Sequence, residues 1–138
     1  MLNKMCTEKW KESGEHMEQL GMSESEFGLM DFIWDNNPVD TATLVKYGEE
    51  MFSWTKSTTY TILKRLENKG FTKKDKSMVY ALIDKEQVID YETDRFVERT
   101  FKGSFPSLVS AFLGRSKISK EEAEKLIDII NSNIDDEV

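Results

Sequence analysis

The stretch that decides the predicted fold is residues 54–82, which reads WTKSTTYTILKRLENKGFTKKDKSMVYAL. Ile62, Leu63 and Leu66 recur at helical spacing, so we expect a helix over about 55–69. Gly70 suits the left-handed backbone position just past the end of a helix. The helix is therefore expected to end there and to be followed by a different kind of element.

The second half of this stretch has the pattern of a β-hairpin. Residues 71–74 and 78–82 are rich in strand-forming side chains, and Asp75, Lys76 and Ser77 can turn the chain between them. A helix followed directly by a hairpin is the order of the last elements in a winged helix-turn-helix domain. The sequence therefore predicts that the hairpin is the wing.

Two further helices are expected upstream. Ser23 and Glu26 have the spacing of a capping box, which satisfies two orphan backbone donors at a helix start. Apolar residues follow at helical spacing until Pro38, which disfavours helical geometry in the residue before it. Thr41 is expected to cap the second helix, and Gly48 inside that helix indicates close packing against a neighbour.

The fold class expected is mainly α with a small β-hairpin wing. We predict a winged helix-turn-helix domain over 22–83 and a helical dimerisation region over 84–134. Residues 1–21 have no sustained apolar stripe, so we expect a loosely ordered N-terminal extension. Residues 135–138 are expected to form an acidic tail.

The C-terminal third has more apolar side chains than a small winged domain can bury. A two-fold dimer would cover them and place two reading helices about one DNA turn apart. The alternative is a monomer with a larger core. The residues expected in the dimer interface are Phe101, Phe105, Leu108, Val109, Phe112, Leu113, Leu126, Ile127 and Ile130.

Composition excludes several classes of protein. The chain has 138 residues and a single cysteine, which excludes a disulfide framework within one chain and favours the cytosol. It has no apolar run long enough to cross a membrane and no secretory signal pattern. We expect no metal and no cofactor, because the only histidine has no second ligand near it in the sequence.

The charge of the chain is unevenly distributed. Residues 55–76 contain seven basic and two acidic side chains, a net charge of +5 in a chain whose total is −7. A basic island with exposed hydroxyl groups is typical of a DNA-reading helix, although each residue alone could be an ordinary cap or solvent cover. The residues expected to contact DNA are Lys56, Ser57, Thr58, Tyr60, Thr61, Lys64, Arg65, Lys73, Lys74 and Lys76.

Three blocks of sequence resemble the BlaI/MecI/CopY family of penicillinase repressors. They are SESEFGLMDFIW at 23–34, WTKSTTYTILKRL at 54–66 followed by KGF at 69–71, and FKGSFPSLVSAF at 101–112. The blocks fall in the family's order, and the resemblance covers about 22–132. It implies a homodimeric repressor that binds double-stranded palindromic operators. It also places Thr58, Thr61 and Arg65 on the recognition helix.

The resemblance carries an expectation about how repression is relieved. Members of the β-lactam branch are cut in their dimerisation helices by a protease linked to a sensor, typically between Asn and Phe. The matching pair here is Ala111–Phe112, so this candidate proteolytic site lacks the asparagine. The copper branch has a C-terminal cysteine cluster, but this chain has no cysteine after Cys6, so copper sensing of that kind is not expected.

Two other classes of function compete with this interpretation. An enzyme has little support, because Ser/His/Asp patterns, metal-ligand spacings and phosphate-binding glycine loops are absent from the sequence. The second alternative is a winged-helix module that contacts only proteins, and the negative net charge keeps this alternative open. DNA binding is distinguished from it by a steep loss of affinity with salt.

Overall fold

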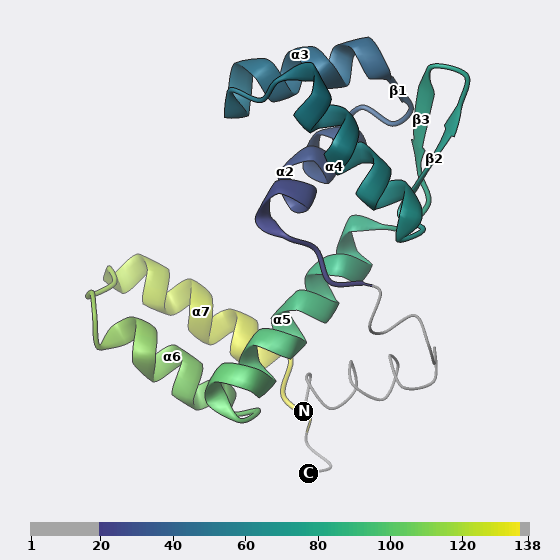
Figure 1. The fold of residues 1–138 in the computed structure, drawn as a ribbon. Coiled ribbons are helices and arrows are strands. Elements are labelled where there is room, and N and C mark those ends of the chain that lie inside the picture. Colours follow the sequence, from purple (N-terminus) through teal and green to yellow (C-terminus); the bar gives the residue numbers. More distant parts are fainter. Residues whose placement is uncertain (1–19, 136–138) are drawn as a thin grey trace. The chain divides into compact units, whose positions relative to one another are not determined.

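The structure is a computed structural model that describes residues 20–135 (Figure 1). These residues belong to two compact units, 20–92 and 93–135, with the division inside a helix. Residues 1–19 of the predicted N-terminal extension and residues 136–138 of the predicted acidic tail lie outside the described residues, whereas Leu20 at the end of the extension is buried. The first unit contains α2 (Glu24–Asp35), β1 (Val39–Asp40), α3 (Thr41–Phe52), α4 (Lys56–Asn68), β2 (Thr72–Asp75), β3 (Met78–Ala81) and the first part of α5 (Lys85–Phe101). The second contains the rest of α5, α6 (Phe105–Leu113) and α7 (Lys120–Ser132).

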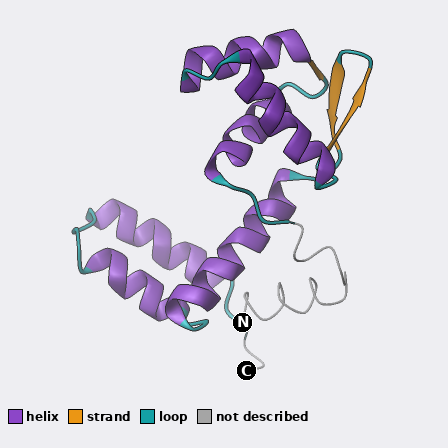
Figure 2. Cartoon of the chain, viewed as in Figure 1, coloured by secondary structure: helices purple, strands orange, loops and turns teal. Residues whose placement is uncertain are grey.

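The predicted fold class is confirmed. The described part of the chain is mostly helical, and its strands are confined to the small sheet of the first unit (Figure 2). Among the described residues, the helices α2, α3 and α4 precede the β2–β3 hairpin, which is the winged helix-turn-helix order. The hairpin differs from the prediction only at its ends, because the first strand runs one residue later and the second ends one residue earlier.

Helix α2 begins with the predicted capping box. The Ser23 hydroxyl accepts a hydrogen bond from the Glu26 backbone N–H at 3.2 Å, and the Glu26 carboxylate accepts one from the Ser23 N–H at 3.0 Å. These two bonds satisfy donors that a helix start leaves without intrahelical partners. The apolar stripe that follows buries Leu29, Met30 and Ile33 completely.

The core of the winged domain lies where α2, α3, α4 and the hairpin meet. Each element contributes a side chain that is fully shielded from solvent, and these include Leu29, Ile33, Leu44, Leu66 and Val79. Since every buried aliphatic side chain contributes about 1.5–3 kcal/mol, this cluster holds α4 at a fixed place on the domain. One face of α4 is thereby used for packing, and its opposite face is free.

Gly48 lets α3 and α4 approach closely, as its place in the sequence predicted. A Cβ atom on Gly48 would lie 2.5 Å from Oγ1 of Thr59 in α4 and 3.0 Å from the ring of Trp54. The predicted cap of α3 was wrong by one residue. Asp40 occupies the N-cap position without a side-chain bond to the helix backbone, and its carboxylate accepts a hydrogen bond from Thr43 instead.

The wing contains a third strand that the sequence analysis did not predict. The sheet is antiparallel in the order β1-β3-β2, and Val39 of β1 pairs with Val79 of β3. The base of the wing is also tied to α2 and the residues after it. The Asn37 side chain accepts a hydrogen bond from the Ala81 N–H at 3.0 Å, and the Trp34 indole donates to the Ile83 carbonyl at 2.8 Å. The wing is therefore fixed at its base to the same scaffold as α4.

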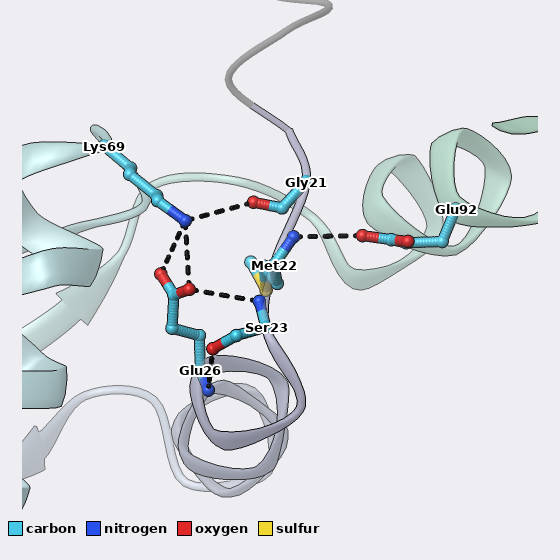
Figure 3. Close-up of polar contacts among 6 residues, drawn as sticks. All are labelled: Gly21, Met22, Ser23, Glu26, Lys69 and Glu92. Atoms are coloured by element: carbon cyan, nitrogen blue, oxygen red, sulfur yellow. Dashed lines mark hydrogen bonds and ion pairs between the residues drawn. The ribbon is translucent and has the colours of Figure 1, made fainter.

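A buried carboxylate joins the end of α4 to the start of α2 (Figure 3). The Lys69 ammonium lies 2.9 Å from Oε1 and 2.8 Å from Oε2 of Glu26, and it donates to the Gly21 carbonyl at 3.3 Å. Beside them, the Met22 N–H donates to a Glu92 carboxylate oxygen of α5 at 3.0 Å. The Lys69 ammonium thus bridges the end of one helix and the start of another.

The environment of Glu26 lowers the pKa of its carboxyl group. Burial by itself raises this pKa, but hydrogen bonds from Lys69 and from Ser23 outweigh burial. A carboxyl group whose pKa is lower in the folded than in the unfolded state stabilises the fold at neutral pH. That contribution is lost as the pH falls below the ordinary range of a glutamate and through the lowered pKa.

We expect Lys69→Met to lower the free energy of unfolding by about 1–2 kcal/mol at pH 7, between the values for exposed and buried ion pairs. The variant should also lose less stability than the wild type between pH 7 and pH 3. Urea denaturation at both pH values measures these quantities. Lys125→Met is the matched control, because its ion pair with Glu121 is exposed and its loss should change stability by less than about 0.5 kcal/mol. Equal stability of Lys69→Met and wild type at pH 7 would show that the bridge contributes nothing.

Candidate nucleic-acid interface

The residues predicted to contact DNA all lie on α4 or the wing, and all of them are exposed. Helix α4 buries Thr59, Ile62, Leu63 and Leu66 against the scaffold. The hydroxyl and basic side chains occupy the remaining faces of the helix, and the hairpin lies beside it (Figure 1). The structure thus brings the two halves of the predicted set together in one unit of the protein.

The first turns of α4 present several hydroxyl groups. Thr55 is the N-cap, and its Oγ1 accepts a hydrogen bond from the Thr58 N–H at 3.2 Å and lies 3.0 Å from the Thr58 Oγ1. The Thr61 hydroxyl donates to the Ser57 carbonyl at 3.0 Å. Because that proton is engaged within the helix, Thr61 offers an outside partner its methyl group and its oxygen lone pairs. These small groups allow close approach to base edges and to thymine methyls.

An open hollow of about 320 Å³ lies between α4 and the wing, lined by Tyr60, Leu63, Lys64, Glu67, Lys74 and Lys76. Three of these side chains are lysines. Leu63 contributes an apolar side chain to the lining, and Tyr60 contributes an aromatic ring. A concave surface with several cations and no deep apolar cavity suits a phosphate group better than an apolar ligand.

Tyr60 lies close to lysines of both elements. The ammonium groups of Lys56 in α4 and Lys74 in the wing each lie 5.9 Å from the centroid of its ring. A third lysine, Lys73, lies 5.4 Å from the ring of Tyr80 within the wing. A cation within about 6 Å of an aromatic face is attracted by the negative potential of the ring.

Glu67 is a residue of this surface that sequence reasoning did not include. It is the one acidic side chain among those that line the hollow, and its carboxylate lies 3.9 Å from the ammonium of Lys64. The spacing of Lys64 and Glu67 could have indicated this pair, because residues three apart on a helix are neighbours. Glu67 therefore partly neutralises Lys64 and repels anions from the hollow.

The residues expected in a dimer interface lie at the end of α5 and on α6 and α7. Neither α6 nor α7 has a single buried residue among those described. Phe112 is 68% exposed, Ile127 is 55% exposed and Ile130 is 48% exposed. The candidate cleavage pair, Ala111 and Phe112, lies exposed within α6. Two amphipathic helices with uncovered apolar faces have the surface that a protein partner would cover.

The described residues contain no cluster of three or more His, Cys, Asp or Glu side chains that could hold a metal ion. Over the same part of the chain, none of the helices has the length and apolar character needed to cross a membrane.

Comparisons with known proteins identify one family. The model of the penicillinase repressor family matches residues 22–132. The methicillin resistance regulatory protein MecI of Staphylococcus aureus strain N315 is 31% identical over 115 residues, which cover 80% of this chain and 93% of that protein. The protein of the same name from Mammaliicoccus sciuri shows the same identity and coverage. The penicillinase repressor of Bacillus licheniformis is 28% identical over 116 residues, covering 81% of this chain and 91% of the relative.

Proposed function

Since the chain belongs to the penicillinase repressor family, we propose that it is a transcriptional repressor that binds palindromic operator DNA as a homodimer. The relatives are named as repressors and regulatory proteins rather than as enzymes. The observation that carries the proposal is the single exposed surface that α4 and the wing form. On it, the hydroxyl groups of the first turns of α4 are followed by Lys64 and Arg65, and the other face of the helix is anchored in the core.

Each part of this surface has a role in the proposal. Thr58 and Thr61 lie in the first turns of α4 and contact base edges in the major groove. Arg65, one turn beyond Thr61, donates two parallel hydrogen bonds to a guanine or a phosphate. The wing lysines contact the backbone that flanks the groove, where their charge releases counterions.

The homodimer of the proposal rests on the uncovered apolar faces of α6 and α7. A second copy of the chain offers the same faces, so a two-fold pairing is self-complementary. The dimer has two copies of the recognition helix, and each copy binds one half-site of a palindromic operator. The acidic remainder of the chain keeps nonspecific association weak, because like charges repel the phosphates from other faces.

The salt dependence of DNA binding tests this function. Fluorescence anisotropy with a duplex of about 30 base pairs, repeated over a range of salt concentrations, should give a linear fall of log affinity with log salt. The slope should correspond to several phosphate contacts in each protomer. Absence of binding at low salt would contradict the proposal and favour the alternative of a winged domain that contacts only proteins.

Glu67→Gln is expected to increase DNA affinity. The change removes the one acid from the wall of the hollow and releases Lys64, so a phosphate meets less repulsion there. The increase should be about two- to fivefold, the range of an exposed charge interaction. Anisotropy titration at fixed salt measures it, and Glu86→Gln, which removes an exposed acid outside the hollow, should leave the affinity unchanged. A reduced affinity of Glu67→Gln would show that the carboxylate orders Lys64 for binding instead of opposing it.

A further inference from the structure

One contact between α4 and the wing involves Tyr60, whose ring lies near a lysine of each element. Tyr60 is not among the residues that α4 buries, and it is 37% exposed. Lys56 comes from the first turn of the same helix, whereas Lys74 comes from β2. Because both ammonium groups lie 5.9 Å from one ring centroid, they are within about 12 Å of each other.

Pairing in the wing fixes the backbone of Lys74, but it does not fix the direction of its long side chain. Its side chain is exposed, and its backbone is paired with Val79 inside the wing. The hydrogen bonds of Asn37 and Trp34 fix the base of the wing, which is the end farthest from the hairpin turn. Attraction to the ring of Tyr60 therefore restrains the long, flexible side chain of Lys74, which strand pairing alone does not restrain.

We propose that Tyr60 is a positioning residue for DNA binding, which holds Lys74 of the wing toward α4 so that one backbone phosphate is bound in the hollow between them. This inference rests on the proposed function and assigns a ligand group to the hollow. The hollow has the required chemistry, since Lys64, Lys74 and Lys76 line it together with the ring. The ammonium groups donate hydrogen bonds to the phosphate oxygens. Because the ring already restricts the Lys74 side chain, Lys74 loses less conformational entropy when the phosphate binds.

The number of phosphate contacts is read from the slope of log affinity against log salt, which changes by about 0.9 for each contact in duplex DNA. We therefore expect Tyr60→Leu to reduce the slope by about 0.9 for each protomer, and Lys74→Ala to reduce it equally. The double variant should show no further reduction, because both changes remove the same contact. Tyr60→Phe keeps the ring and should keep the wild-type slope.

The probe is a mixed-sequence duplex, so the measurement needs no known operator. Tyr80→Leu is the matched control: it removes a tyrosine ring that lies 5.4 Å from the Lys73 ammonium, but neither residue lines the hollow in which the phosphate is proposed to bind. Its slope should equal that of the wild type. Thermal melting of each variant checks that the domain remains folded.

Three results would overturn the inference. The first is an unchanged slope in Tyr60→Leu, the second is additive losses in the double variant, and the third is a loss in Tyr60→Phe as large as in Tyr60→Leu. Each of them leaves the proposed function in place if the wild type binds DNA with a steep slope. Failure of the wild-type protein to bind any duplex at low salt would instead remove the function and the inference together.

Discussion

Phe112→Asp is expected to separate the protein into folded monomers and to weaken operator binding by about 100-fold or more. Phe112 is 68% exposed in the single chain, so an aspartate there disturbs nothing that the monomer buries. In the proposed dimer the same position lies in an apolar interface, where an unpaired charge is costly. The loss of affinity follows from the loss of avidity, since linking two binding modules raises affinity by about 10²–10⁴.

Sedimentation velocity and operator titration of the same variant test this prediction. Phe112→Leu is the control, because it keeps an apolar side chain and should keep the dimer. The circular dichroism of Phe112→Asp should match that of the wild type, which separates dissociation from unfolding. A stable dimer of Phe112→Asp would place the interface elsewhere on the chain.

Arg65→Ala is expected to lower operator affinity by about 1–3 kcal/mol in each half-site without unfolding the protein. Arg65 is exposed in the last turn of α4 and is not among the side chains that this helix buries, so the fold does not depend on it. In the proposed complex Arg65 forms two parallel hydrogen bonds with a guanine edge or a phosphate, which alanine cannot replace.

The two targets of Arg65 give different results. Contact with a guanine predicts that Arg65→Ala also relaxes preference at one operator position, whereas contact with a phosphate predicts equal loss on all sequences and a smaller salt slope. Arg99→Ala, an exposed arginine in the last turn of α5, is the control and should bind as the wild type does. Wild-type affinity of a folded Arg65→Ala would remove Arg65 from the interface.

The elements of the winged domain could be predicted from the sequence because local signals agreed with one another. The capping box at Ser23 and Glu26 marked the start of α2, and Gly70, with a φ of 83°, marked the end of α4. Gly48 indicated a close approach of two helices, and in the structure it packs directly against Thr59 and Trp54. Each of these signals depends on residues a few positions apart in the chain.

What could not be predicted depends on residues far apart in the chain. The two residues of β1 have no periodic pattern, and they form a strand only because β3 lies beside them. Lys69 reaches Glu26 across 43 positions, so its bridging role is a property of the packed helices. The exposed surface of α4 was easier to predict. Once the buried stripe of a helix is identified, the residues on its other faces must be exposed to solvent.

The most direct test of the central claim is capture of genomic DNA fragments by the purified protein at low and at moderate salt, followed by sequencing. Sequence-specific dimers should enrich fragments with a common palindrome, and this enrichment should survive moderate salt while nonspecific binding is lost. The spacing of the two half-sites should be close to one helical turn or a multiple of it. Capture without a shared motif, or binding lost equally from all fragments as salt rises, would contradict the account and leave the winged domain as a module that contacts proteins.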